Sequence, residues 1–390
     1  MKARNILSTA AQNAWPSGVR RMFELAKNYD DSINLTLGEP GFVTPDHIIE
    51  AGIQGLRAGK TKYTPNAGIR ELREAIAWKL EKENGIKCDP EKNLIVTAGA
   101  TQALMLAMVA LVNPGDEVII QGPNWPDYRG QIDMVNGKTV YAKVSEENGF
   151  KMTADIIEPL ITDKTKLIIV NSPSNPTGGV LDEDDLRAIG ELVKKYKLFV
   201  ISDEPYERLV YDGFVQKSLA ACCEGLEDYV LTVNSLSKTF AMTGFRVGYI
   251  CANEHIMENL IKLHENMVAS VPEPMQLAAV EAIYHGEEDV RRMVEYYDRN
   301  RRLIVDGLNG INGFSCVCPR GAFYVFPNIT GFGMSSVEAA EHILEKTHVV
   351  TAPGSAFGPD GEGFLRICYA SKYEDIAEAL RRMREAFGTK

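Results

Sequence analysis

The run TKLIIVNSPSNPTGGVLDEDDLRAIGELVKKYKLFVISD, residues 165–203, places an apolar strand, a helix and a second apolar strand in succession. Neither LIIV (167–170) nor LFVIS (198–202) alternates apolar with polar residues, so we expect both faces of these strands to be covered. A helix is predicted between them, from Glu183 to Tyr196. The run predicts an α/β fold with a largely parallel sheet flanked by helices, and function at the carboxyl ends of the strands.

The alternation of helices and strands continues on both sides of this run. On the N-terminal side we expect helices at 70–85 and 100–112 and strands at 93–99, 116–122 and 138–144. On the C-terminal side the strand YVLTV (229–233) leads into NSLSK. Further along we expect helices within 253–309, near 337–346 and from residue 373, and a strand at GAFYVFPNI (321–329).

The length of the chain predicts two domains, because 390 residues exceed what one hydrophobic core usually serves. We expect a large domain at 46–289 and a smaller one at 290–390. Residues 1–45 are expected to join the smaller domain, as an arm with a short helix from Val19 to Tyr29 and a loop rich in Gly and Pro.

Composition excludes several classes of partner. The chain has 42 Lys and Arg against 53 Asp and Glu, and this net charge of -11 repels nucleic acid and anionic lipid. No stretch approaches the roughly 20 apolar residues of a membrane span, and the start lacks a cleavage pattern. The seven cysteines are odd in number and include closely spaced pairs, so we expect reduced thiols in the cytoplasm and neither disulfides nor a metal site.

Lys238 lies just past a strand's carboxyl end, where its amine can reach into a cleft. A lone lysine is usually a solvated surface residue. Here Ser235, Ser237 and Lys238, with Arg246 eight residues later, resemble the pyridoxal-phosphate (PLP) attachment motif of the class I and II aminotransferases. The resemblance implies that Lys238 is the catalytic lysine and carries PLP as a Schiff base, for which its amine must lose its proton.

The resemblance to this fold-type I family runs from about residue 33 to the C-terminus. It implies a large domain with a mostly parallel sheet of the seven-stranded type, flanked by helices, and a smaller α+β domain. It also implies a PLP-dependent aminotransferase that moves an amino group from an L-amino acid to a 2-oxo acid by a ping-pong mechanism.

The ring of the cofactor is expected to meet residues at strand ends. Asp203 ends the strand LFVIS and is the expected partner of the pyridine nitrogen, whose protonated form makes the ring an electron sink. The resemblance places Tyr206 and Asn175, the latter at the end of LIIV, on the phenolic oxygen. It places Trp125 in GPNWPDY against the face of the ring. Alone, Asp203 could be a helix cap and Trp125 a core residue.

The phosphate is expected to bind at TAGATQAL (97–104), where a helix begins with free backbone N–H groups. A helix start of small residues is weak evidence by itself. The expected cofactor contacts on this side are Gly99, Ala100, Thr101, Ser235, Ser237 and Arg246. The segment KYTPNAGIRELREAI (62–76) resembles the one whose tyrosine reaches the neighbouring subunit's phosphate, so Tyr63 implies a homodimer with shared sites.

The substrate is expected to bind Gly38 in LGEP, Trp125, Asn175 and Arg366 in FLRICYAS, where the arginine grips the α-carboxylate. One bacterial branch of aspartate aminotransferases has a lysine at the position of Thr101, so aspartate specificity by that route is in doubt. Aromatic residues at Trp15, Phe42 and Phe357 favour aromatic or neutral substrates, unless they serve only packing.

Three alternative functions compete with amino-acid transamination. A β-eliminating C–S lyase resembling cystathionine β-lyase has the same fold and carbanion chemistry, although LGEPGFVTP (37–45) favours transamination. A PLP-binding DNA regulator needs a winged helix, for which residues 1–32 are too few. An α/β binding protein without cofactor is the third.

Overall fold

The computed structural model describes residues 7–13 and 18–390. Trp15 lies outside the described residues. The N-terminal segment contains α1 (Thr9–Asn13) and α2 (Gly18–Ala26), and α2 corresponds to the helix expected from Val19. No helix within the described ranges has both the length and the apolar character needed to cross a membrane.

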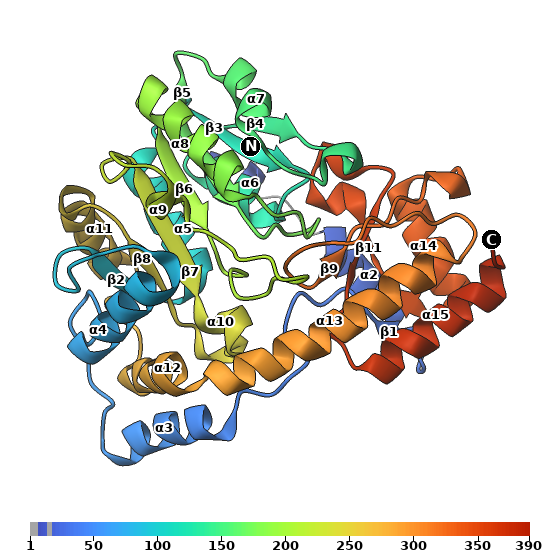
Figure 1. The fold of residues 1–390 in the computed structure, drawn as a ribbon, viewed down its shortest axis with the longest axis horizontal. Helices are drawn as coiled ribbons and strands as arrows, with labels where there is room; N and C mark the ends of the chain where they lie inside the picture. Colours follow the sequence, from blue (N-terminus) through green and yellow to red (C-terminus); the bar gives the residue numbers. More distant parts are fainter. Residues whose placement is uncertain (1–6, 14–17) are drawn as a thin grey trace, which may run out of the picture.

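The centre of the molecule is a seven-stranded sheet with the order β2-β8-β7-β6-β5-β3-β4 (Figure 1). Strands β4, β3, β5, β6 and β7 run parallel, whereas β8 is antiparallel to both neighbours. The bounds are β2 (Leu94–Thr97), β3 (Glu117–Gly122), β4 (Lys138–Lys143), β5 (Thr165–Asn171), β6 (Phe199–Asp203), β7 (Val230–Ser235) and β8 (Gly248–Cys251). The predicted mostly parallel sheet is confirmed.

Both faces of the sheet are covered, as the apolar strands predicted. On one face Ile119, Ile168 and Val200 pack with α8 (Glu183–Tyr196), α9 (Leu219–Cys222) and α7 (Ala154–Ile157). On the other face their neighbours along the strands, Ile120 and Ile169, pack with α5 (Gly99–Leu111), α6 (Pro126–Met134) and α11 (Glu254–Met267). Neighbouring side chains on a strand point to opposite faces, so each strand serves two cores.

Helix α8 begins and ends where the sequence predicts. Asp182 caps it by accepting a hydrogen bond from the backbone N of Asp185 at 3.1 Å, and Lys197 ends it in a left-handed conformation at φ 53°. Its apolar residues, such as Leu186 and Ile189, face the sheet.

The edge of the sheet near β2 is covered by a helical layer. It comprises α3 (Asp46–Arg57), α4 (Arg70–Lys79) with the π-helical turn η1 (Leu80–Asn84), and α12 (Glu273–His285). Figure 1 shows α3 beneath α12. Between β7 and β8 lie α10 (Leu236–Thr239) and the turn η4 (Thr243–Phe245).

A smaller layer of strands and helices lies beside the large sheet (Figure 1). Its strands are β9 (Tyr324–Val325), β11 (Ala352–Pro353) and β12 (Leu365–Cys368) in one sheet, and β1 (Ile33–Asn34) with β10 (Val349–Val350) in another. Its helices are α14 (Ser336–Thr347) and α15 (Tyr373–Phe387), and the long α13 (Glu287–Asn309) reaches it from α12. The predicted domain boundary at residues 289–290 falls inside α13 and stays a prediction.

Two expectations for strands need correction. The strand expected over 321–329 has only Tyr324 and Val325 in the sheet, because Ala322 has a left-handed φ of 58° and Pro327 has no N–H for the ladder. Strand β8 was not predicted, since its four residues are too few to show a period. Short turns occupy η2 (Glu146–Asn148), η3 (Glu158–Leu160), η5 (Thr330–Phe332), η6 (Gly354–Phe357) and η7 (Pro359–Gly361).

Candidate active site

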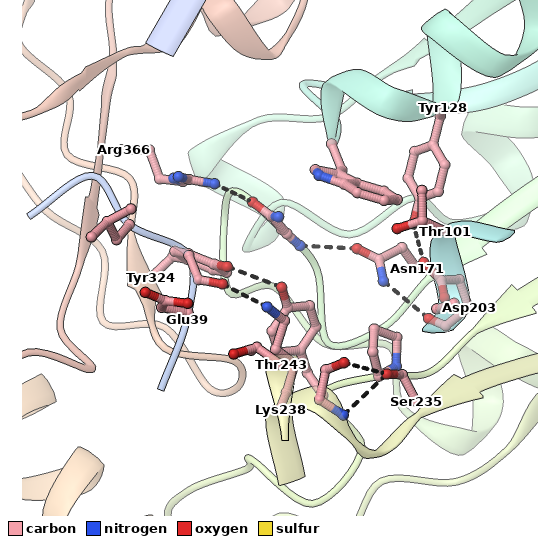
Figure 2. A pocket seen from close by; sticks show the side chains of 18 of the residues that line it. Glu39, Thr101, Tyr128, Asn171, Asp203, Ser235, Lys238, Thr243, Tyr324 and Arg366 are labelled. Carbon is pink, nitrogen blue, oxygen red and sulfur yellow. Dashed lines mark hydrogen bonds between the residues drawn. The ribbon is translucent and has the colours of Figure 1, made fainter. Parts of the chain in front are cut away.

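A pocket of about 370 Å³ lies at the carboxyl ends of β5, β6 and β7 (Figure 2). All but two of the predicted site residues line it: Gly38, Ala100, Thr101, Trp125, Asn175, Asp203, Tyr206, Ser235, Ser237, Lys238, Arg246 and Arg366. These residues come from strand ends of the large sheet, from β12 and from the loop after β1. The pocket therefore lies where a parallel sheet is expected to bind ligands.

Lys238 projects into this pocket from α10, just after β7. Its Nζ donates a hydrogen bond to the carbonyl oxygen of Gly38 at 2.6 Å. Burial lowers the pKa of Lys238 to about 8, and the cations of Arg366 and Arg246 act in the same direction. A much larger share of this amine is neutral near pH 8 than of an ordinary lysine, and the neutral amine is the nucleophile.

Asp203 ends β6 with only 2 % of its surface exposed. Its Oδ2 accepts a hydrogen bond from the hydroxyl of Tyr128, and its Oδ1 has no partner among the described residues. Burial raises the pKa of Asp203 to about 7, although the bond from Tyr128 opposes this. A cationic ring nitrogen beside Oδ1 would satisfy that buried atom, so the site fits a protonated pyridine.

A second buried group with an unsatisfied atom is the guanidinium of Arg366. Its Nη1 donates to Oδ1 of Asn175 at 3.0 Å, and its Nη2 donates to the carbonyl of Thr36 at 2.6 Å. The Nε of Arg366 is buried without a partner within the described residues. The Cζ of Arg366 lies 4.6 Å from the centroid of the Tyr324 ring. A buried cation held by neutral acceptors is suited to an incoming carboxylate.

The expected phosphate cradle is tightly packed. Arg246 donates to the carbonyl of Thr243 at 3.1 Å and lies so close to Gly99 that a Cβ there would come within 2.5 Å of its Nη2. Gly99 has a φ of 77°, which also favours glycine. It does not line the pocket, so the structure places it beneath Arg246 and leaves Ala100 at the surface of the cradle.

Hydroxyl groups lie opposite the start of α5. The Oγ of Ser235 donates to the Oγ of Ser237 at 2.8 Å, and both residues line the pocket. Arg246 and the free N–H groups at the helix start add positive potential. Donors of this kind fit a phosphate.

Tyr63 is the other predicted residue that does not line the pocket. Its side chain is 90 % exposed in the loop between α3 and α4. The predicted reach into a neighbouring subunit stays a prediction, because one chain cannot test it.

The expected place of Asn175 was wrong by four residues, because β5 ends at Asn171. The backbone N of Asn175 donates to Oδ1 of Asn171 at 2.9 Å, and Nδ2 of Asn171 donates to the carbonyl of Asp203 at 3.0 Å (Figure 2). Asn175 still lines the pocket from the following loop.

Sequence reasoning missed Tyr128, Asn171 and Tyr324, which line the same pocket. Tyr128 lies in α6 three residues after Trp125, the N-cap residue of that helix, and their rings meet edge-on with centroids 5.4 Å apart. That spacing was a usable signal. Tyr324 bonds the hydroxyl of Tyr206 at 3.0 Å, and no local pattern could reveal a contact across 118 residues.

Of the aromatic residues expected near the substrate, Phe42 and Phe357 do not line this pocket. Phe42 packs edge-on against Tyr296, with 5.1 Å between ring centroids. Phe357 is buried beneath Arg366, whose guanidinium lies 4.5 Å from its ring. In this chain both side chains serve packing.

Comparison with known proteins gives one consistent result. The family described as aminotransferase class I and II matches residues 30–383. An aspartate aminotransferase of Pyrococcus abyssi is 41 % identical over 96 % of this chain and 96 % of its own length. An aromatic-amino-acid aminotransferase 2 of Thermococcus litoralis is 39 % identical over 98 % of this chain and 99 % of its own. The solved aspartate aminotransferase of Thermus thermophilus with maleate has a TM-score of 0.92 and 36 % identity, covering 98 % of this chain and all of its own.

Proposed function

Because the chain belongs to the class I and II aminotransferases, which depend on PLP, we propose that the pocket at the ends of β5 to β7 is its active site. The chain is a PLP-dependent amino-acid aminotransferase. The arrangement that supports this site is Lys238, with its lowered pKa, in one pocket with the unpaired Oδ1 of Asp203 and the buried Arg366.

We assign the cofactor's contacts to the residues that line the pocket. Bound PLP supplies an electron sink for the substrate's α carbon. Asp203 would hold the proton on the ring nitrogen, Tyr206 and Asn175 would bind the phenolic oxygen, and Trp125 would cover the ring. The phosphate side comprises Ala100, Thr101, Ser235, Ser237 and Arg246 above Gly99.

Lys238 has two tasks in this proposal. It would hold the cofactor through its aldehyde carbon, and once freed by a substrate amine, it would carry the proton from the substrate's α carbon to the cofactor's C4′ carbon. A pKa of about 8 suits a base that works near neutral pH.

The substrate's α-carboxylate is assigned to Arg366, with Gly38 and Asn175 beside it. The similar proteins are named for aspartate and for aromatic amino acids, and Thr101 supplies no distal cation. We propose an L-amino acid that is aromatic, neutral or aspartate as donor, with a 2-oxo acid as acceptor.

Two further parts of the proposal concern the cell and the assembly. We propose a homodimer with Tyr63 crossing between sites, supported by the 90 % exposure of that apolar ring. A cytoplasmic location is supported by cysteines that are all free.

The test is a single half-reaction. The holoenzyme is mixed with one L-amino acid at a time and no acceptor, and the cofactor's spectrum is followed. Conversion of bound PLP to pyridoxamine phosphate, with one 2-oxo acid released, is expected. A wild-type protein that keeps its visible band with every amino acid, or that releases pyruvate from cystathionine, would contradict the proposal.

A further inference from the structure

A buried polar cluster lies behind the loop that carries Asp203 and Tyr206. None of its residues lines the pocket, and no residue in it is more than 9 % exposed. Its members come from the end of α4, the turn η1, β6 with the loop after it, and the residue before α9. They are Lys79, Asn84, Ser202, Glu204, Glu207 and Ser218.

Glu204 is held at both its side chain and its backbone. Its Oε1 accepts from the Oγ of Ser202 at 2.6 Å, and its Oε2 accepts from the Oγ of Ser218 and from Nδ2 of Asn84. Its backbone N donates to the carbonyl of Val233 on β7 at 2.9 Å. These bonds fix the peptide that follows Asp203.

Glu207 makes the hydrogen bonds that fix the other end of the loop that begins at Glu204. It accepts from Nζ of Lys79 and from Nδ2 of Asn84, while Lys79 also donates to Oδ1 of Asn84 at 2.8 Å. The backbone N of Glu207 donates to the carbonyl of Glu204 at 3.2 Å. Tyr206 therefore lies on a turn that is held on both sides.

The charges of the cluster do not balance. Lys79 is the cation beside the carboxylates of Glu204 and Glu207. The neighbouring Arg208 forms ion pairs with Glu83 at 3.0 Å and with Glu287 at 2.8 Å. Burial raises the pKa of Glu204 to about 7, and the charge of Glu207 adds to the rise. A buried ionic cluster is weak evidence for stability, and its best-attested use is to specify geometry.

The geometry in question is that of the cofactor's ring. Adjacent side chains of a strand point to opposite faces, so when Asp203 points into the pocket, Glu204 points into the cluster. Resting on the proposed function, we propose that Glu204 is a positioning residue for transamination. It fixes the peptide between Asp203, which faces the ring nitrogen, and Tyr206, which faces the phenolic oxygen.

The experiment compares Glu204→Leu with Glu204→Gln and with a control at another buried, paired carboxylate. Glu117 is 5 % exposed and accepts hydrogen bonds from Lys138 at 2.8 Å and from Thr162 at 2.6 Å. It lies at the amino end of β3, whereas the pocket lies at the carboxyl ends of the strands. Glu117→Leu therefore matches the loss of a buried carboxylate away from the pocket. The readouts are kcat/KM, the pH at which the cofactor's visible band titrates, and the thermal unfolding of the apo protein.

Glu204→Leu is expected to lower kcat/KM by about tenfold or more. A loss of this size corresponds to one weakened hydrogen bond between the displaced loop and the cofactor. It is also expected to raise the pH of the spectral titration, because Tyr206 no longer stabilises the ionised phenolic oxygen. Glu204→Gln keeps a side chain that bonds the serines and is expected to restore most of both. Glu117→Leu is expected to lower the unfolding temperature alone.

If both leucine variants change the spectral titration equally, or if Glu204→Leu changes only stability, Glu204 is merely structural. Should Glu204→Leu not fold, Ser218→Ala removes a single donor and is judged by the same spectral shift. A wild-type enzyme that fails the half-reaction would sink the proposed function instead, so the two failures are distinguishable.

Discussion

At Lys238, burial and one backbone contact set the state of the amine. The pKa of about 8 follows mainly from burial, and the hydrogen bond to Gly38 directs Nζ across the pocket. The residue thus combines a nucleophile's protonation state with a fixed direction.

Lys238→Ala is expected to lower kcat by about 10²–10⁴-fold, because the proton at the α carbon loses its acceptor. Borohydride is expected to fix the cofactor to the wild type and not to this variant, which mass spectrometry of the intact chain measures. Lys166→Ala, at the second residue of β5 and away from the pocket, serves as the matched control. Covalent fixation in Lys238→Ala would mean that another lysine carries the cofactor.

Tyr128→Phe is expected to weaken the enzyme through Asp203. In the wild type, the hydrogen bond from the Tyr128 hydroxyl lowers the pKa of Asp203. In the variant this pKa rises, so the carboxylate is protonated more readily as the pH falls. A hydrogen bond to a charged group contributes about 1.5–3 kcal/mol, so kcat/KM should drop roughly tenfold or more, most strongly at acidic pH.

A pH profile of kcat/KM from acid to neutral pH measures this effect. Tyr196→Phe, which removes a hydroxyl bonded to Glu158 at 3.0 Å on the exterior, is the control. A parallel downward shift at all pH values would argue against action through the charge of Asp203.

The residues to which we assign the chemistry could be expected in one pocket, because motifs fix their positions relative to strand ends. The residues that contact them were harder to predict. The bond from Tyr324 to Tyr206 joins β9 to the loop after β6, and only the folded chain brings these segments together.

At the scale of elements, α8 was predictable from its cap despite Gly190, whereas α3, which has no side-chain cap, was not. Helix α3 contains Gly52 and Gly55, which weaken a helix in isolation. In the fold they face α12, where a Cβ on Gly55 would lie 3.1 Å from Cα of Pro274. Close packing against α12 stabilises α3 where its intrinsic helix propensity is weak. This packing joins distant parts of the chain, so no local sequence pattern could reveal it.

The attachment of α3 depends on pH through His47. Its Nδ1 lies 2.8 Å from Glu281 on α12, and its Nε2 lies 3.0 Å from Asp289 on α13. Burial disfavours the charge, but the hydrogen bonds to Asp289 and Glu281 outweigh it and raise the pKa of His47 above its ordinary value of 6.5.

His47 therefore stabilises the fold fully below pH about 6.5, and the contribution is lost as the pH rises through the higher folded-state pKa. His47→Gln is expected to lower the melting temperature by about 2 °C or less, since the pairs are partly exposed. The difference from the wild type should shrink between pH 5.5 and pH 9, as calorimetry of the two proteins measures. A difference that grows with pH would contradict the assignment.

At the scale of the whole molecule, the proposed homodimer requires a surface that a second copy covers. The large sheet with helices on both faces could be predicted from strands that are apolar throughout. An interface between two copies produces no such periodic pattern in the sequence. In the proposed dimer, Tyr63 and Val43, 90 % and 81 % exposed, are among the large side chains that the second copy would cover.

Subunit mixing tests whether Tyr63 acts across the interface. Lys238→Ala and Tyr63→Ala are each expected to be weakly active alone. In a mixed dimer, one site receives Lys238 from one chain and Tyr63 from the other, so activity should return. Each variant mixed with itself is the control. If Tyr63 served its own chain, no site in the mixture would be intact and activity would stay low.

The division between strand ends and loops also governs how this protein can change. The groups that do the chemistry are fixed to the ends of buried parallel strands, where substitution disturbs the core. The turns near Gly354–Phe357 border the binding residues without belonging to the central sheet, whereas the loop after β1 contains Gly38, whose carbonyl accepts from Lys238. A substitution library confined to these turns is therefore expected to yield altered substrate preference with the reaction retained, so new specificities are accessible without redesign of the fold.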